Sequence, residues 1–322
     1  MRVGTNALLI SNKRDISLDY VVDELRRQQK GFLRVNTEDL PTMTGEVRFP
    51  DFKHELTRDG RSWDMLSQFS GIFYRRPGRP FADDCASEDE NVVKNYCWEQ
   101  WAAYLDANLS INDVIWINHP VTSSLMESKI RQLNMAQAMG FSIPRTCVTW
   151  TKDIARSFVE SCPSGAIAKS LSSTILEYPE KDYFVFTNEV ASVDGIDESE
   201  LAMSPVIFQE KIPDKVDVRV TVVGSDVFAV RIESTDDSEI PLDWRTKKES
   251  VGFTPLTLPD LTKSLCQRYV QSAGLVFGAI DLLYAEDRYI FLEINPSGEW
   301  GWLQARADLP IARSIVNELF SN

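Results

Sequence analysis

Three side chains that could bind a cation lie close together near the C-terminus of the chain. The stretch GAIDLLYAEDRYIFLEIN (residues 278–295) alternates apolar and polar residues on both sides of a charged turn, which predicts a β-hairpin. A three-residue turn at residues 286–288 places Asp281 directly opposite Glu293, with Asn295 diagonally next to them on the same face. The expected buried face consists of Ile280, Leu282, Tyr284, Ile290, Leu292 and Ile294.

Two carboxylates at cross-strand distance repel each other, so this arrangement needs a compensating charge. A divalent cation supplies it, and hard oxygen ligands without sulfur or imidazole select magnesium or manganese over zinc. A carboxyl pair that shares one proton and a different turn are the competing interpretations. The pattern favours a metal site formed by Asp281, Glu293 and Asn295.

A second hairpin is predicted at VDVRVTVVGSDVFAVRIES (residues 216–234). Alternation predicts one buried face, made of Val216, Val218, Val220, Val222, Phe228, Val230 and Ile232. The other face would then hold Asp217, Arg219, Thr221, Arg231 and Glu233. Two arginines on one face repel unless acidic groups lie between them. They pair with the neighbouring carboxylates, or they bind a phosphate or a substrate carboxylate in bidentate fashion.

Two lysines occur in otherwise apolar elements. A helix is expected between Pro120 and Gly140, with capping-box spacing at Ser124 and Glu127. Its apolar stripe would comprise Leu125, Met126, Ile130, Leu133 and Ala136. Lys129 falls inside this stripe, where it extends from the edge of the face to solvent or points at a buried anion. Lys169 lies in the middle of the expected strand GAIAKSL.

Bulk properties narrow the classes of protein that fit. The 322 residues are enough for two or three domains. The net charge of −14 argues against a nucleic-acid or membrane-surface binder, since both need basic patches. Five cysteines without a CxxC pair, and only two histidines, make a zinc site unexpected and indicate reduced thiols in a cytoplasmic protein. Neither a signal peptide nor a membrane span is expected.

The order of expected elements divides the chain into three parts. Residues 1–118 alternate strands and helices, which predicts a βαβ layer, and no GxGxxG supports a dinucleotide site. Residues 119–205 form a small α+β module, and residues 206–322 contain the two antiparallel hairpins. The fold class is therefore α/β (α+β).

The ordered set of these residues resembles the ATP-grasp ligases from about Asn118 to the C-terminus. Its parts are a lysine in a helix, a lysine in a strand, a polar strand end, an acidic residue after it and a terminal D…ExN set: Lys129, Lys169, Gln209, Glu210, Lys211, Ile212, Asp217, Asp281, Glu293 and Asn295. SLSSTILEYPE (residues 170–180) stands where many members have a glycine-rich phosphate loop.

The resemblance implies a role for each of these residues. Lys129 and Lys169 would contact the ATP phosphates, and the backbone around Lys211 and Ile212 would bind the adenine edge. The strand end would also supply Gln209, with Glu210 and Asp217 near the nucleotide amino group and ribose. The terminal set would hold one or two magnesium ions, which manganese could replace. The implied fold has an N-terminal pre-ATP-grasp domain, a central subdomain and a C-terminal antiparallel subdomain.

Within that family the chain is most similar to the microviridin-type (graspetide) ribosomal-peptide maturases. The shared stretches are FYRRP, INHP, SKIRQLNMAQAMGFSIPRTCVT, KSLSS, DWR, EINPSGEWGWLQ and LPIARSIV. The resemblance implies that Asp or Glu side chains of a precursor peptide, with a leader and an acidic core, become acyl phosphates and then ester or amide rings. Arg219, Arg231 and Arg245 are the candidates for holding the reacting carboxylate. A homodimer is also implied, and an amino-acid or peptide ligase is the alternative.

Overall fold

The computed structural model describes residues 5–80, 88–172, 175–176, 183–184, 187–235 and 250–321. The chain separates into two compact units, one comprising Met1–Pro120, Leu275–Phe277 and Glu299–Asn322, the other Val121–Gly274 and Gly278–Gly298. The mixed α/β class expected from the sequence is confirmed. The division into domains 1–118, 119–205 and 206–322 stays a prediction.

The first unit is built on a parallel four-stranded sheet in the order β2-β1-β6-β7. Its strands are β1 (Asn6–Ser11), β2 (Gly31–Asn36), β6 (Phe69–Tyr74) and β7 (Ile115–Ile117). Helix α1 (Ile16–Arg27) joins β1 to the parallel β2, which confirms the predicted βαβ arrangement. The Asp15 side chain caps this helix by accepting a hydrogen bond from the Leu18 N–H.

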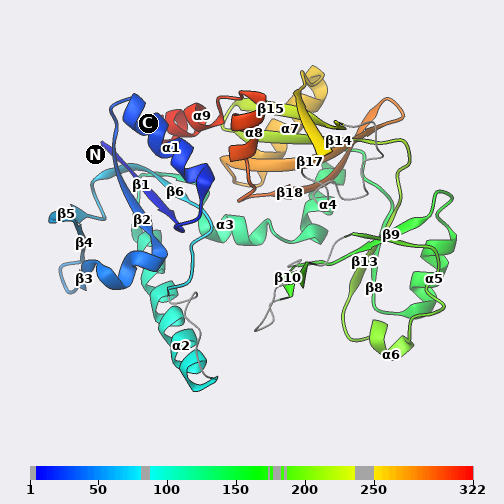
Figure 1. The fold of residues 1–322 in the computed structure, drawn as a ribbon, viewed down its shortest axis with the longest axis horizontal. Helices are drawn as coiled ribbons and strands as arrows, with labels where there is room; N and C mark the ends of the chain where they lie inside the picture. The colour runs from blue at the N-terminus through cyan, green and yellow to red at the C-terminus, as the bar shows by residue number, and fades with distance from the viewer. Residues whose placement is uncertain are drawn as a thin grey trace. The chain divides into compact units, whose positions relative to one another are not determined.

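The C-terminal helices belong to this same unit. Figure 1 shows α9 (Ile311–Leu319) next to α1, although the two are far apart in the sequence, and α8 (Gly301–Ala307) also packs on α1. Gly71 permits the close approach of α9 to β6, because a Cβ there would lie 2.5 Å from the Leu319 carbonyl oxygen. Further elements of the unit are η1 (Thr37–Thr42), the three-stranded sheet β3 (Thr44–Arg48), β4 (Lys53–Arg58) and β5 (Arg61–Asp64), α2 (Glu88–Leu105) and η2 (Asp106–Ser110).

The second unit contains a two-stranded antiparallel pair and two larger sheets. The smaller one has the order β12-β9-β13-β8, with β8 (Thr146–Thr149), β9 (Ala166–Lys169), β12 (Asn188–Val190) and β13 (Val206–Glu210). The larger one has the order β16-β15-β14-β17-β18, with β14 (Val216–Val223), β15 (Asp226–Ser234), β16 (Val251–Pro255), β17 (Phe277–Ala285) and β18 (Arg288–Asn295). Shorter elements are α5 (Lys152–Glu160), α6 (Glu198–Leu201), β10 (Ile175–Leu176) and β11 (Tyr183–Phe184).

The helix expected between Pro120 and Gly140 is two helices, α3 (Pro120–Leu125) and α4 (Lys129–Ala138). The cap of α4 is Ser128, whose hydroxyl accepts from the Arg131 N–H, so the predicted capping box at Ser124 was wrong. The break removes Lys129 from the middle of a helix and makes it the first residue of α4. Because the stripe is interrupted, Leu125 and Ile130 are exposed while Met126, Leu133 and Ala136 are buried.

Helix α7 (Asp260–Ser272) packs on β14 and β15, and α4 packs on β18. Tyr269 of α7 forms an aromatic cluster with Phe291 of β18 and with Phe141, with ring centroids 4.9 to 5.9 Å apart. These contacts anchor β18 of the β17–β18 hairpin, which carries the residues of the candidate site.

Candidate active site

The β17–β18 hairpin brings the three predicted metal ligands together. Asp281 is the direct cross-strand partner of Glu293, as predicted, and Asn295 lies opposite Ala279, the position two residues before Asp281. The predicted three-residue turn was wrong. Glu286 and Asp287 alone form the turn, both with positive φ, and a β-bulge next to Leu282 adds one residue to the other strand. Beyond the bulge, the register equals the one that a longer turn would give.

Each of the two carboxylates lies near a cation from another element. The Lys129 ammonium is 3.8 Å from a Glu293 carboxylate oxygen and donates a hydrogen bond to the Ser170 carbonyl at 2.9 Å. Arg219 of β14 lies 3.2 Å from Asp281. Within this arrangement the positive groups offset the repulsion between the two carboxylates.

The two arginines of the β14–β15 hairpin lie on opposite faces of the sheet, so the predicted shared face was wrong. The register pairs Arg219 with Val230 and Val218 with Arg231, which is one residue out of step with the predicted alignment. Arg219 therefore shares its face with Thr221 and Ile232, while Arg231 contacts Glu233 on the other face at 3.4 Å.

Arg219 is the buried cation of the site, with 9% of its side chain exposed. Its Nε and Nη1 atoms have no hydrogen-bond partner among the described residues, although Nη1 lies within ion-pair distance of Asp281. The neighbouring Thr221 hydroxyl is also buried and also has no hydrogen-bond partner among the described residues. Buried polar groups are normally satisfied, so this face of β14 suits an anionic ligand with several acceptor oxygens.

The polar strand end at β13 is held mainly by the protein itself. The Gln209 amide donates to the Thr146 hydroxyl at 2.9 Å, and the Glu210 carboxylate accepts from the Arg145 backbone N–H at 2.9 Å. The Lys211 backbone N–H donates to the Gly165 carbonyl at 3.0 Å, while its ammonium contacts Glu189 at 2.6 Å. The Lys211 N–H is therefore already bonded within the protein.

Two of the remaining predicted residues lie close to these elements. Ile212 packs on the hairpin that carries the predicted metal ligands, against Leu283, Ala285 and Ile290. Asp217 accepts a hydrogen bond from the Lys215 ammonium.

Lys169, the last residue of β9, lies opposite Ile207 of β13. Lys129 donates a hydrogen bond to the carbonyl of Ser170, the residue that follows Lys169, so the two predicted phosphate lysines are linked through Ser170. Arg245 lies outside the described residues, as does most of the segment that follows Ser172.

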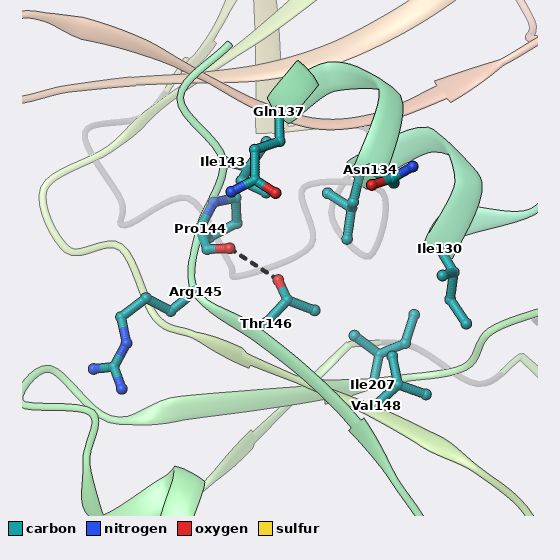
Figure 2. A pocket seen from close by; sticks show the side chains of 10 residues that line it. Ile130, Asn134, Gln137, Ile143, Pro144, Arg145, Thr146, Val148 and Ile207 are labelled. Atoms are coloured by element: carbon teal, nitrogen blue, oxygen red, sulfur yellow. Dashed lines mark hydrogen bonds between the residues drawn. The ribbon is translucent and has the colours of Figure 1, made fainter. Parts of the chain in front are cut away.

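A cavity of about 430 Å³ lies between α4 and the β8–β13 pair (Figure 2). Figure 2 shows side chains of α4 on one side and Val148 and Ile207 on the other, with the Thr146 hydroxyl donating to the Pro144 carbonyl. Its lining residues are Ile130, Leu133, Asn134, Gln137, Ile143, Pro144, Arg145, Thr146, Val148 and Ile207. None of the predicted site residues lines it, but Thr146 is the partner of Gln209.

The described residues contain no group of three or more His, Cys, Asp or Glu side chains placed to hold a metal. A cation at the hairpin would thus depend on the Asn295 oxygen and on oxygens from a ligand, as magnesium commonly does in phosphate sites. None of the helices in the described ranges has the length and apolar character required to cross a membrane.

The sequence profile of the RimK-like ATP-grasp domain matches residues 126–319, so the chain belongs to this family. It is accordingly an ATP-dependent, ADP-forming ligase, and ATP and magnesium are the cofactors of the family. This establishes the resemblance found in the sequence. The roles of the individual residues stay predictions.

Solved structures resemble the chain over nearly its whole length. A RiPP-associated ATP-grasp ligase from Chryseobacterium gregarium, solved with ADP and a leader and core peptide, is 26% identical, with a TM-score of 0.87 over 98% of this chain and 97% of that one. The macrocyclase MdnB from Microcystis aeruginosa is 25% identical, with a TM-score of 0.79 over 99% and 100%. A probable alpha-L-glutamate ligase from Mannheimia succiniciproducens is 23% identical over 65% of this chain and 68% of its own length.

Proposed function

We propose that this ligase activates Asp or Glu side chains of a ribosomal precursor peptide and closes them into ester or amide macrocycles. The observation that carries the proposal is the match to the Chryseobacterium gregarium ligase across both chains, including the parallel sheet that lies before the family domain. That enzyme is described with a leader and a core peptide. A similar first unit in this chain is expected to serve the same kind of substrate.

In this proposal Asp281, Glu293 and Asn295 hold magnesium, for which manganese could substitute. The bound metal neutralises charge on the transferring phosphoryl group. Lys129 and Lys169 bind the phosphates, and the backbone at Lys211 and Ile212, together with Gln209, Glu210 and Asp217, surrounds the nucleoside. The donor set fits this cation, because it consists of oxygens on one sheet face beside two basic side chains.

Arg219 is the residue that we assign to the reacting carboxylate or its acyl phosphate. Its burial, its unsatisfied nitrogen atoms and its position next to Asp281 support this role. Arg231 lies on the opposite face, so a joint clamp with Arg219 is not part of the proposal. Arg245 stays a candidate on the grounds of its DWR motif.

A ligase that joins amino acids or peptides intermolecularly is the second candidate, favoured by the likeness to a probable alpha-L-glutamate ligase. Incubating the protein with ATP, magnesium and a candidate precursor decides between them by mass spectrometry. Ring closure removes one water per ring from the peptide, whereas ligation adds the mass of a residue. A mass gain would exclude the macrocyclase function. The implied homodimer is tested separately by sedimentation.

Turnover by Glu293→Gln and Asp281→Asn variants tests the metal site. Both substitutions keep the size of the side chain and remove a negative charge, so loss of magnesium-dependent ADP release with retained folding is expected. Turnover equal to that of the unaltered protein would contradict the assignment.

A further inference from the structure

Gln132 is a buried polar side chain to which the proposed reaction gives no role. It lies on α4, three residues after Lys129, and 2% of it is exposed. A buried amide carries one acceptor and two donors that need partners, so the partners show what the side chain does.

All three hydrogen-bonding positions of the amide are used. Oε1 accepts from the backbone N–H of Ile294 at 3.0 Å, and Nε2 donates to the Ile294 carbonyl at 2.9 Å. Nε2 also donates to the Met126 carbonyl at 2.6 Å. Because β18 is the last strand of the five-stranded sheet, Gln132 bonds the outer edge of β18 as the peptide unit of one more strand would.

The backbone that Gln132 holds is the one between two proposed metal ligands. Glu293 and Asn295 flank Ile294, and side chains two residues apart on a strand share a face. The bond to Met126 also fixes the three-residue break that precedes α4 and hence the position of Lys129, its first residue. Residues three apart on a helix lie on one face, so Lys129 and Gln132 both reach β18.

The backbone of Gln132 is itself fixed. Its carbonyl accepts a hydrogen bond from the buried Tyr269 hydroxyl at 3.0 Å. The Tyr269 ring packs on Phe291, three residues before Ile294 on the same strand. Through Tyr269, the backbone of Gln132 is therefore held against β18, the same strand that its side-chain amide bonds at Ile294.

We infer that Gln132 is a positioning residue that sets Glu293 and Asn295 in register with Lys129, so that the metal and phosphate sites form together. The inference rests on the proposed function, because it assumes a magnesium site at this hairpin. Gln132 acts through the backbone and touches neither the metal nor the nucleotide.

A Gln132→Met variant keeps the side-chain length but removes the amide. The dissociation constant of Mn²⁺ in the presence of ADP, read from the electron paramagnetic resonance signal of free Mn²⁺, should rise roughly tenfold to a hundredfold, as is typical for residues that orient metal ligands. Gln271→Met, on the exposed side of α7, is the matched control and should leave this constant unchanged. Urea unfolding midpoints separate a loss of fold from a loss of affinity.

A Gln132→Glu variant adds a pH readout that a purely structural role would not give. When protonated, the new carboxyl accepts from the Ile294 N–H and donates to one of the two carbonyls. When ionised, it faces the Ile294 and Met126 carbonyls and repels them. Burial favours the neutral form. The Mn²⁺ affinity of this variant relative to the unaltered protein should therefore rise as the pH is lowered from about 8 to about 6, whereas that of Gln132→Met should stay constant.

The outcomes separate this inference from the proposed site. If Glu293→Gln loses Mn²⁺ binding while Gln132→Met and Gln132→Glu bind as the unaltered protein does, the site is right and the positioning role is wrong. If Glu293→Gln also binds normally, the proposed metal site itself is wrong. If Gln132→Met does not fold, the pH dependence of Gln132→Glu decides.

Discussion

Asp281 and Glu293 are direct partners across the β17–β18 hairpin, and each lies beside a basic side chain from outside the hairpin. Arg219 comes from the neighbouring strand and Lys129 from the first turn of α4. Two carboxylates and two cations thus meet on one sheet face. Binding of a metal and a polyphosphate would keep this balance, since the metal adds positive charge and the phosphates add negative charge.

Replacing Lys129 with methionine removes the cation while keeping most of the side-chain volume. A charge-assisted hydrogen bond contributes about 1.5–3 kcal/mol, so the dissociation constant of ADP with magnesium is expected to rise roughly tenfold to a hundredfold. Calorimetric titration measures it. Lys263→Met, on the exposed side of α7, serves as the control and should bind ADP normally. Equal affinities for the two variants would contradict a phosphate role for Lys129.

The β17–β18 hairpin shows what sequence patterns can predict. The pairing of Asp281 with Glu293 was found because the apolar residues on both strands are spaced by two and a charged turn separates them. The length of the turn was not predicted correctly, because a two-residue turn with a bulge and a three-residue turn both place Asp281 opposite Glu293. Only the backbone conformation distinguishes them.

The β14–β15 hairpin shows why alternation fails in a strand buried on both faces. Every residue of β14 from Val218 to Val223 is buried, including Arg219 and Thr221, so polarity does not mark the outer face. The register then follows the two-residue turn at Gly224 and Ser225, which places the arginines apart. Gln132 was missed for a different reason, because its partner Ile294 is 162 residues away.

The buried ion pair of Asp15 and Arg75 is expected to contribute strongly to the stability of the first unit. Their atoms are 2.5 Å apart with 1% and 3% of the side chains exposed, and Asp15 also caps α1. Asp15→Asn removes the nearer of two charge partners of the buried guanidinium, because Glu299 also lies 2.9 Å from Arg75. We therefore expect the loss of one charge-assisted hydrogen bond, about 1.5–3 kcal/mol. Asp23→Asn breaks an exposed pair on the same helix and should cost less than about 1 kcal/mol. Urea unfolding compares them, and equal effects would contradict the prediction.

His54 makes the stability of the first unit depend on pH. Burial lowers the pKa of its imidazole, against a smaller opposing effect of Asp64, and Nε2 lies 3.0 Å from the Tyr104 hydroxyl. The unfolded chain binds a proton near pH 6.5 while the folded protein does so only at lower pH. Its contribution to stability is therefore complete above about pH 6.5 and is lost as the pH falls through the lowered pKa. In urea unfolding between about pH 5 and 8, His54→Phe should flatten the pH dependence of the free energy of unfolding. An unchanged slope would contradict a role for His54.

Arg219 and Arg231 provide a test of which sheet face carries the chemistry. Arg219 is buried beside Asp281, whereas Arg231 is about half exposed and contacts Glu233 on the opposite face. If the reacting carboxylate binds Arg219, Arg219→Met should lower the turnover of precursor or ADP release roughly a hundredfold, as the loss of one donor to a developing charge typically does. Arg231→Met should lower this turnover by a factor at least ten times smaller.

Arg219→Lys adds a finer test, because it keeps the charge but loses the bidentate geometry, and we expect a rate between those of the unaltered protein and Arg219→Met. Steady-state rates at saturating ATP and magnesium, with unfolding midpoints as the check on folding, give the comparison. A larger effect at Arg231 than at Arg219 would mean that the substrate binds on the other face of the sheet, away from Asp281.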